Sequence, residues 1–225
     1  DRIHTAFSYQ LQSEAALDQP GLLELVYDPT GGMLYLTHRE GLEELLPTRR
    51  AFASFRASSY HTVLAPSTLG SGLLVGTPPA LGRPQPLTRI AANSEGRPLY
   101  LPLDYLSDGA DALATAGGHL YLYQQASGRL LRLNNRRLET CAKIPAGPAL
   151  LEGSPDGRLF IALVQSRELW RAEDLDQDGS FTSPGELRQV TQLPDRPLAL
   201  SFGAQLYLGL AGGHLYRLGA DERLE

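Results

Sequence analysis

Three stretches of the chain align with one another and share one pattern of apolar and polar residues. Each stretch has an apolar/polar alternation, a turn rich in Gly or Ser and a second alternation, and they cover residues 119–133, 158–172 and 205–218. Alternation with a period of two on both sides of a short turn is typical of a β-hairpin. Residues from Met33 onward fit the same template more loosely. The sequence therefore predicts a chain built from repeated hairpins.

Each hairpin belongs to a larger unit. A short strand and a turn precede it, as in Asp-Pro-Thr-Gly-Gly at 28–32 and Ser-Pro-Asp-Gly at 154–157. Proline presets φ in such turns, and glycine accepts a positive φ. A further strand follows, as at 137–145 and 187–194. Four-stranded units that repeat every 40 to 50 residues or so are typical of a β-propeller, so we expect an all-β fold of this type.

The spacing of the units predicts five four-stranded blades in a single domain. Second strands begin near residues 33, 119, 158 and 205, and the wide first interval implies a further unit, for which residues 71–79 are the candidate. The expected blades cover approximately 20–56, 57–107, 108–147, 148–196, and 197–225 together with 1–19.

The final unit stops after its third strand, which leaves an open sheet edge. An open edge invites pairing with another chain. Residues 2–12 have the pattern of a strand without a hairpin partner, so we expect this N-terminal strand to complete the last blade. It can do so within one molecule or in a neighbour, and head-to-tail exchange between neighbours builds filaments when it does not close.

Composition narrows the range of partners and environments. The chain has 225 residues and a net charge of −5 without a basic run, which argues against nucleic acid as the partner. No apolar stretch approaches the roughly 20 residues that a membrane helix needs. Cys141 is the sole cysteine, so no disulfide forms within the chain, and we expect it to be a buried or half-buried hydrophobic residue. The chain begins at Asp1, which fits a trimmed chain or a mature secreted protein without its leader.

One loop carries a carboxylate cluster that occurs once in the chain. Asp174, Asp176 and Asp178 alternate with other residues, and Gly179 follows. Carboxylates this close repel one another unless a cation neutralises them, and a flexible loop of oxygen ligands favours Ca²⁺. The expected ligands are Asp174, Asp176, Asp178, Ser180, Thr182 and Glu186. The alternative is a solvated acidic loop. We expect the ion to be structural, because the loop joins two strands of one blade.

These motifs resemble those of secreted bacterial β-propellers of the NHL-repeat and gluconolactonase-like type. The resemblance rests on Ser-Pro-Asp-Gly-Arg-Leu-Phe-Ile-Ala at 154–162, Leu-Trp-Arg at 169–171 and the Asp-Leu-Asp-Gln-Asp-Gly…Pro-Gly-Glu insertion. It covers residues 110–225 well and residues 20–109 poorly. The resemblance implies a secreted propeller with a calcium loop. Repeats of this kind specify a fold and many functions, so activity is inferred by analogy alone.

A catalytic set is not recognisable. Lactonase-type propellers imply a metal held by Glu, Asn and Asp from different blades, and no asparagine here lies in a matching motif. His119 and His214 both lie in Ala-Gly-Gly-His-Leu-Tyr, which favours a repeated turn over a catalytic pair. A second acidic stretch with Asp104, Asp108 and Asp111 is more typical of a solvated loop than of a cation site.

Aromatic residues recur at one strand position and predict a packing layer between blades, namely Tyr35, Tyr121, Phe160 and Tyr207. We therefore expect a secreted, extracellular or periplasmic protein without enzymatic activity. It would act as a structural or interaction module through protein partners or self-association, with filament formation through the N-terminal strand as one version. The alternative is an enzyme or small-molecule binder at the propeller channel, of the lactone hydrolase or sugar oxidoreductase type.

Overall fold

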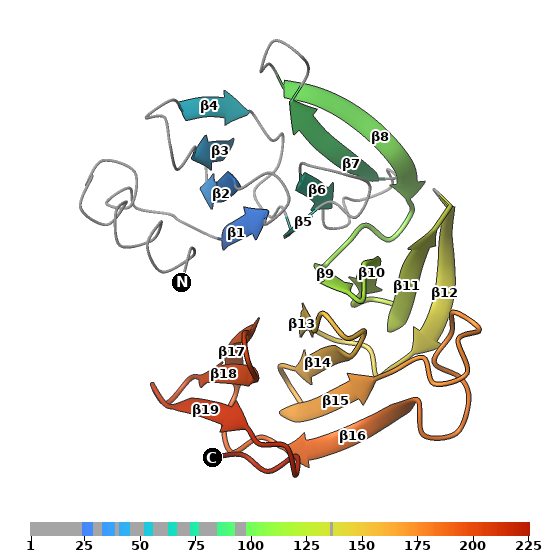
Figure 1. Ribbon diagram of the computed structural model, residues 1–225, viewed down its shortest axis with the longest axis vertical. Helices are drawn as coiled ribbons and strands as arrows, with labels where there is room; N and C mark the ends of the chain where they lie inside the picture. The colour runs from blue at the N-terminus through green and yellow to red at the C-terminus, as the bar shows by residue number, and fades with distance from the viewer. Residues whose placement is uncertain are drawn as a thin grey trace.

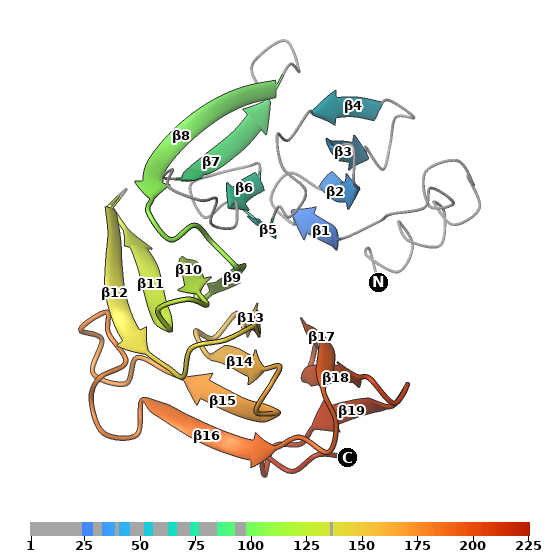
Figure 2. The ribbon, with the colours of Figure 1, turned by 180° about the vertical axis from the view of Figure 1, so that it is seen from behind.

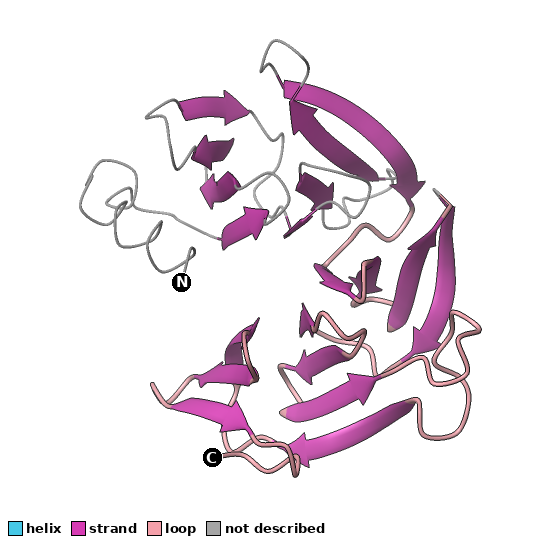
Figure 3. Cartoon of the chain, in the orientation of Figure 1, coloured by secondary structure: helices cyan, strands magenta, loops and turns pink. Residues whose placement is uncertain are grey.

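The computed structural model describes seven strands between residues 24 and 92, followed by residues 98–135 and 137–225. These residues form strands, turns and loops, and no helix occurs among them (Figure 3). Since the described part contains no helix, it contains none that is long and apolar enough to cross a membrane. The all-β class and the four-stranded antiparallel units predicted from the sequence are confirmed.

The described strands form five antiparallel sheets, in each of which a strand pairs with the next along the chain. Sheet 1 contains β1 (Glu24–Asp28), β2 (Met33–His38), β3 (Gly41–Leu45) and β4 (Phe52–Phe55). Sheet 2 contains β5 (Val63–Pro66), β6 (Leu73–Gly76), β7 (Gln85–Ala92) and β8 (Pro98–Leu106). Sheet 3 contains β9 (Ala112–Ala116), β10 (His119–Gln124), β11 (Arg129–Asn134) and β12 (Arg137–Lys143). Sheet 4 contains β13 (Ala149–Gly153), β14 (Leu159–Leu163), β15 (Glu168–Ala172) and β16 (Leu187–Gln192), and sheet 5 contains β17 (Pro197–Phe202), β18 (Leu206–Leu210) and β19 (Leu215–Leu218).

The sheets follow one another along an arc, with sheet 1 and sheet 5 at its two ends (Figure 1). Their first strands lie on the inside, where β1 contacts β5, β5 contacts β9, β9 contacts β13 and β13 contacts β17. Small residues allow this close approach, since a Cβ on Gly153 of β13 would lie 2.0 Å from the carbonyl oxygen of Thr115 on β9.

Apolar side chains fill the space between consecutive sheets. One cluster joins sheets 3 and 4 through residues such as Tyr121 and Ile161, and another joins sheets 4 and 5 through residues such as Phe160 and Leu208. A third joins sheets 2 and 3 around Leu74. Because residues alternate between the two faces of a strand, each sheet offers one face to the sheet before it and one to the sheet after it.

Sheet 5 differs from the other four because it has three named strands. The chain turns back after β19, and Arg217 exchanges backbone hydrogen bonds with Glu225 at 2.9 and 3.0 Å. Leu218 and Leu224 form the adjoining bridge. The C-terminal residues therefore occupy part of the outer edge of β19. Residues 2–12, predicted to take this place, lie outside the described residues.

Candidate metal centre

The carboxylate cluster lies in the connection between β15 and β16. The backbone N–H of Glu173 donates to the carbonyl oxygen of Glu186 at 2.8 Å, which closes the base of this loop. Gln177 and Gly179 both have positive φ, of 61° and 89°. Glycine adopts such a φ without strain, so Gly179 lets the chain turn sharply after the third aspartate. The loop then folds back on its own first residues.

Three of the predicted ligands come together here. Oxygen atoms of Asp174, Asp176 and Glu186 all lie within 4.8 Å of one another. Among the described residues, these three carboxylates form the cluster that could hold a metal ion. Glu186 is buried. Its Oε1 accepts the backbone N–H groups of Leu175 at 3.0 Å and Asp176 at 3.3 Å, and its Oε2 accepts that of Ser183 at 2.9 Å. These bonds hold the buried carboxylate in place, and each oxygen has more than one lone pair.

Asp174 provides the observation that fits a cation. Its Oδ2 accepts the N–H of Gly179 at 3.0 Å and lies 3.2 Å from Nη1 of Arg132 on β11. Its Oδ1 is buried and has no hydrogen-bond partner among the described residues. A buried oxygen without a partner costs free energy, and a hard cation beside Asp176 and Glu186 would satisfy it.

The remaining predicted ligands, Asp178, Ser180 and Thr182, are joined to one another by local hydrogen bonds. Asp178 is exposed, and its Oδ1 accepts the N–H of Ser180 at 2.7 Å. The hydroxyls of Ser180 and Thr182 lie 2.9 Å apart. Asp176 itself is held by the Ser183 hydroxyl, which donates to it at 2.7 Å and lowers the pKa of the Asp176 carboxyl. The structure thus brings together the first, second and last carboxylates of the predicted set.

The loop also packs on the preceding sheet. The N–H of Phe181 donates to the carbonyl oxygen of Cys141 on β12 at 2.8 Å, and the Phe181 ring lies 5.5 Å from that of Tyr121 on β10. Phe181 is buried, and so is Cys141, as predicted for the lone cysteine. Burial raises the pKa values of the Cys141 thiol and the Tyr121 hydroxyl to about 12. Neither Phe181 nor Arg132 was among the predicted site residues.

Other residues considered from the sequence have structural partners. Nη2 of Arg132 donates to Nε2 of His119 at 2.9 Å, and burial together with this guanidinium lowers the pKa of His119. In the second acidic stretch, Asp108 pairs with Arg129 at 2.7 Å and Asp111 accepts the N–H of Gln125 at 2.8 Å.

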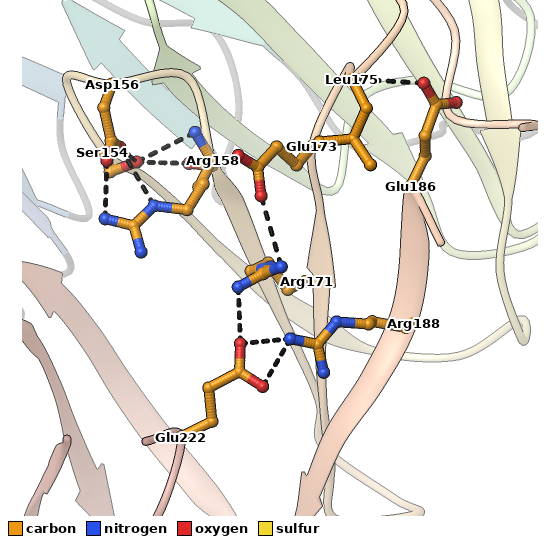
Figure 4. A network of polar contacts seen from close by, with 9 residues as sticks. All are labelled: Ser154, Asp156, Arg158, Arg171, Glu173, Leu175, Glu186, Arg188 and Glu222. Carbon is orange, nitrogen blue, oxygen red and sulfur yellow. Dashed lines mark hydrogen bonds and ion pairs between the residues drawn. The ribbon is translucent and has the colours of Figure 1, made fainter. Parts of the chain in front are cut away.

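A second charged cluster joins sheets 4 and 5 (Figure 4). Arg171 on β15 and Arg188 on β16 are cross-strand neighbours. Glu222, in the turn after β19, accepts from both, at 2.5 Å from Nη1 of Arg171. Arg171 also lies 3.3 Å from Glu173. One carboxylate from sheet 5 thus bridges two adjacent arginines of sheet 4, and Glu173 supplies the second negative charge.

The inner strands β9, β13 and β17 contain one ionisable residue, Glu152. Its Oε1 accepts the N–H of Phe202 on β17 at 3.2 Å. Burial raises the pKa of this carboxyl to about 7. A glutamate inside the apolar run Leu150-Leu151-Glu152 was the available sequence signal, and it was missed.

Solved structures similar to this chain are β-propellers, so the chain has a fold of that type. An auxiliary nutrient binding protein from Bacteroides ovatus matches with a TM-score of 0.70 and 12% identity, over 91% of this chain and 56% of that protein. A calcium-binding protein, regucalcin, from Agrobacterium tumefaciens matches with a TM-score of 0.67 and 16% identity, over 92% of this chain and 74% of its own. An inactive virginiamycin B lyase from Staphylococcus aureus, with quinupristin, matches with a TM-score of 0.65 and 13% identity, over 94% and 71%.

These identities show the fold alone. The chain spans about half the length of the nutrient binding protein, at 56%. No protein-family model matches the sequence, and a comparison with curated proteins found no match.

Proposed function

We propose that this protein is a non-enzymatic structural or interaction module whose architecture is stabilised by a divalent cation, most simply Ca²⁺, in the loop of residues 173–186. The observation that carries the proposal is the buried, unpartnered Oδ1 of Asp174 beside the carboxylates of Asp176 and Glu186. Oxygen ligands on a loop of this kind favour Ca²⁺ over softer metals.

The position of the loop supports a structural rather than a catalytic role. The loop packs on sheet 3 through Phe181 and Arg132, and it does not belong to the inner strands around the propeller axis. A cation that removes the repulsion among three carboxylates would hold Phe181 against Tyr121. The ion would thereby strengthen the contact between two sheets. No step of a reaction is needed to account for these residues.

Calorimetry and thermal unfolding test this proposal. The protein is stripped with a chelator, and Ca²⁺ is added back while the melting temperature and the heat of binding are recorded. We expect Ca²⁺ to raise the melting temperature and Glu186→Gln to abolish the response. Unchanged stability and no heat of binding in the wild-type protein would contradict the proposal.

The mode of interaction is a second part of the proposal. We propose a secreted, extracellular or periplasmic protein that binds protein partners, with self-association through residues 2–12 as the version suggested by the sequence. The partly open edge of β19 supports this version, because an open edge accepts a strand. Mass measurement of the wild-type protein and of a variant without residues 1–14 tests it. A monomer in both cases would contradict assembly.

An enzyme or binder at the propeller channel is the alternative function. The similar structures include a lyase and a nutrient binding protein, so the fold itself favours neither class. The observation to weigh is Glu152, a carboxyl with a pKa of about 7 on an inner strand. Its bond to the Phe202 N–H gives it a role in packing sheet 5 on sheet 4. A screen of lactones and sugars against wild-type protein and Glu152→Gln would identify such an activity.

A further inference from the structure

The third strands of sheets 2 to 5 share a Leu-x-Arg motif. The leucines are Leu87, Leu130, Leu169 and Leu215, each two residues before an arginine. The first three are 0% exposed, and they pack between their own sheet and the one that follows. Leu215 of sheet 5 is 72% exposed. The same position of the repeat is therefore fully buried three times and open once.

The second-strand residue opposite the arginine of each motif is likewise buried in sheets 2 to 4 and exposed in sheet 5. The arginine of each motif pairs across the sheet with Leu74, Tyr121, Phe160 or Tyr207. Leu74 is 0% exposed, and Tyr121 and Phe160 are 2% exposed, whereas Tyr207 is 38% exposed. Tyr207 and Leu215 lie on one face of sheet 5 by strand register, and we call this surface the end face. The end face corresponds to a surface that sheets 3 and 4 bury against a following sheet.

The arginines of the motif add a charge to this comparison. Arg132 reaches Asp174 and Arg171 reaches Glu222, and both acids lie beyond the third strand of the following sheet. Arg217 of sheet 5 pairs with Glu225 of its own sheet instead. Its side chain is 48% exposed, against 16% for Arg132 and 21% for Arg171. The end face therefore offers two apolar side chains and a half-exposed guanidinium.

We propose that residues 1–23 of this chain, which lie outside the described part, pack on the end face of sheet 5. Ile3, Phe7, Tyr9 and Leu11 occupy odd positions, with Thr5 between the first two, and would lie on one largely apolar side of an extended segment. Asp1, Glu14 and Asp18 supply carboxylates for Arg217. This contact is with the face of the sheet, because residues 223–225 already occupy part of the β19 edge.

The position of the segment favours its own sheet 5 over that of another molecule. Residues 1–23 lead directly into β1, and β1 and β17 lie on the two sides of the opening of the arc (Figure 2). A segment tethered beside its binding surface has an effective concentration of order millimolar. A second molecule at ordinary protein concentrations competes poorly with it. The contact uses the same residues as the proposed strand exchange, so a contact within one chain contradicts self-association through residues 2–12, whereas its failure leaves that version standing.

A double-mutant cycle tests the contact. We expect Leu215→Asp and deletion of residues 1–23 each to lower the melting temperature by about 5 °C. The combined variant should be no less stable than either single variant, because both remove the same contact. Tyr105→Asp is the control, since Tyr105 is 65% exposed on β8, far from sheet 5 in the chain. Additive effects, or a silent Leu215→Asp, would overturn the proposal.

Cross-linking keeps the test decisive if the deletion variant does not fold. Cysteines replace Phe7 and Leu215, while Cys141 is buried and does not compete. We expect a short bifunctional maleimide to link the two new thiols within one chain, with the mass of a monomer. A cross-linked dimer, or an oligomer that Leu215→Asp dissociates, would show that a second copy covers the end face and would refute the proposal. A pair of thiols that do not link would also refute it.

Discussion

The interface between sheets 3 and 4 and the interface between sheets 4 and 5 have the same design but a different charge balance. In both, the arginine of a Leu-x-Arg motif reaches an acid that follows the third strand of the next sheet. At the first interface Arg132 faces a loop with three clustered carboxylates. At the second, Glu222 faces two neighbouring arginines and Glu173 lies beside one of them.

The difference explains why a cation is expected at one place and not at the other. Arg171 and Arg188 with Glu173 and Glu222 are electrically balanced, whereas one arginine leaves the Asp174 cluster with excess negative charge. Partly buried charges need a partner of opposite sign. One long insertion has therefore turned an ordinary contact between sheets into a candidate metal centre.

The largest expected effect comes from removing the apolar anchor of the first interface. Phe181→Ala should lower the free energy of unfolding by about 3–5 kcal/mol, because it deletes a buried aromatic side chain. Chemical denaturation measures this loss. Leu175→Ala in the same loop is the matched control, since Leu175 is 59% exposed and should change little. Equal effects of the two variants would contradict the packing of the loop on sheet 3.

The next effect is expected from metal binding, which should stabilise the first interface and leave the second unchanged. Ca²⁺ at a hundredfold excess over its dissociation constant should stabilise the wild-type protein by about 2.7 kcal/mol. Asp174→Asn and Glu186→Gln should lose this gain, and Glu222→Gln should retain it because Glu222 pairs with Arg171 and Arg188 and is not one of the three gathered carboxylates. Thermal unfolding with Ca²⁺ or chelator provides the readout. Asp178→Asn decides whether the third aspartate, which is not one of the three gathered carboxylates, contributes.

The pH dependence of the free energy of unfolding should reveal the titration of Glu152 at the second interface. Burial raises the pKa of this carboxyl from an ordinary 4.5 to about 7, so the folded protein holds its proton more tightly than the unfolded chain. The stability from this group is therefore complete below about pH 4.5 and is lost as the pH rises to about 7, by on the order of 3 kcal/mol. Glu152→Gln should flatten this decline in denaturation curves taken across the range. A variant with the wild-type slope would assign the titration elsewhere.

The smallest effect is expected for the balanced charges of the second interface. Glu222→Ala leaves two adjacent arginines without their shared carboxylate and should cost about 1 kcal/mol. The cost should shrink in high salt, because added ions screen half-exposed charges. Unfolding at two salt concentrations checks this. Arg223→Ala is a control, since the Arg223 side chain is 84% exposed. A loss that does not depend on salt would point to backbone strain at Glu222, whose φ is 63°.

Sequence patterns predicted the local parts of the site better than its contacts. The spacing of Asp174, Asp176 and Glu186 identified three residues that the structure brings together. It also suggested Asp178, whose Oδ1 accepts the Ser180 N–H and whose part in metal binding stays a prediction. Arg132 and Glu222 were missed because each meets its partner from 42 or 51 residues away. Such contacts depend on how one sheet packs on the next, and no local pattern records that.

Alternation, turn residues and repetition in the sequence by themselves determined the strands and their grouping into four-stranded units, because these features act between neighbours in the chain. Tertiary structure alone decided which equivalent positions become buried. Leu169 and Leu215 occupy the same place in the repeat, yet one is fully buried and the other is 72% exposed. Burial depends on whether a following sheet covers the face, and the repeated motif is the same in both cases.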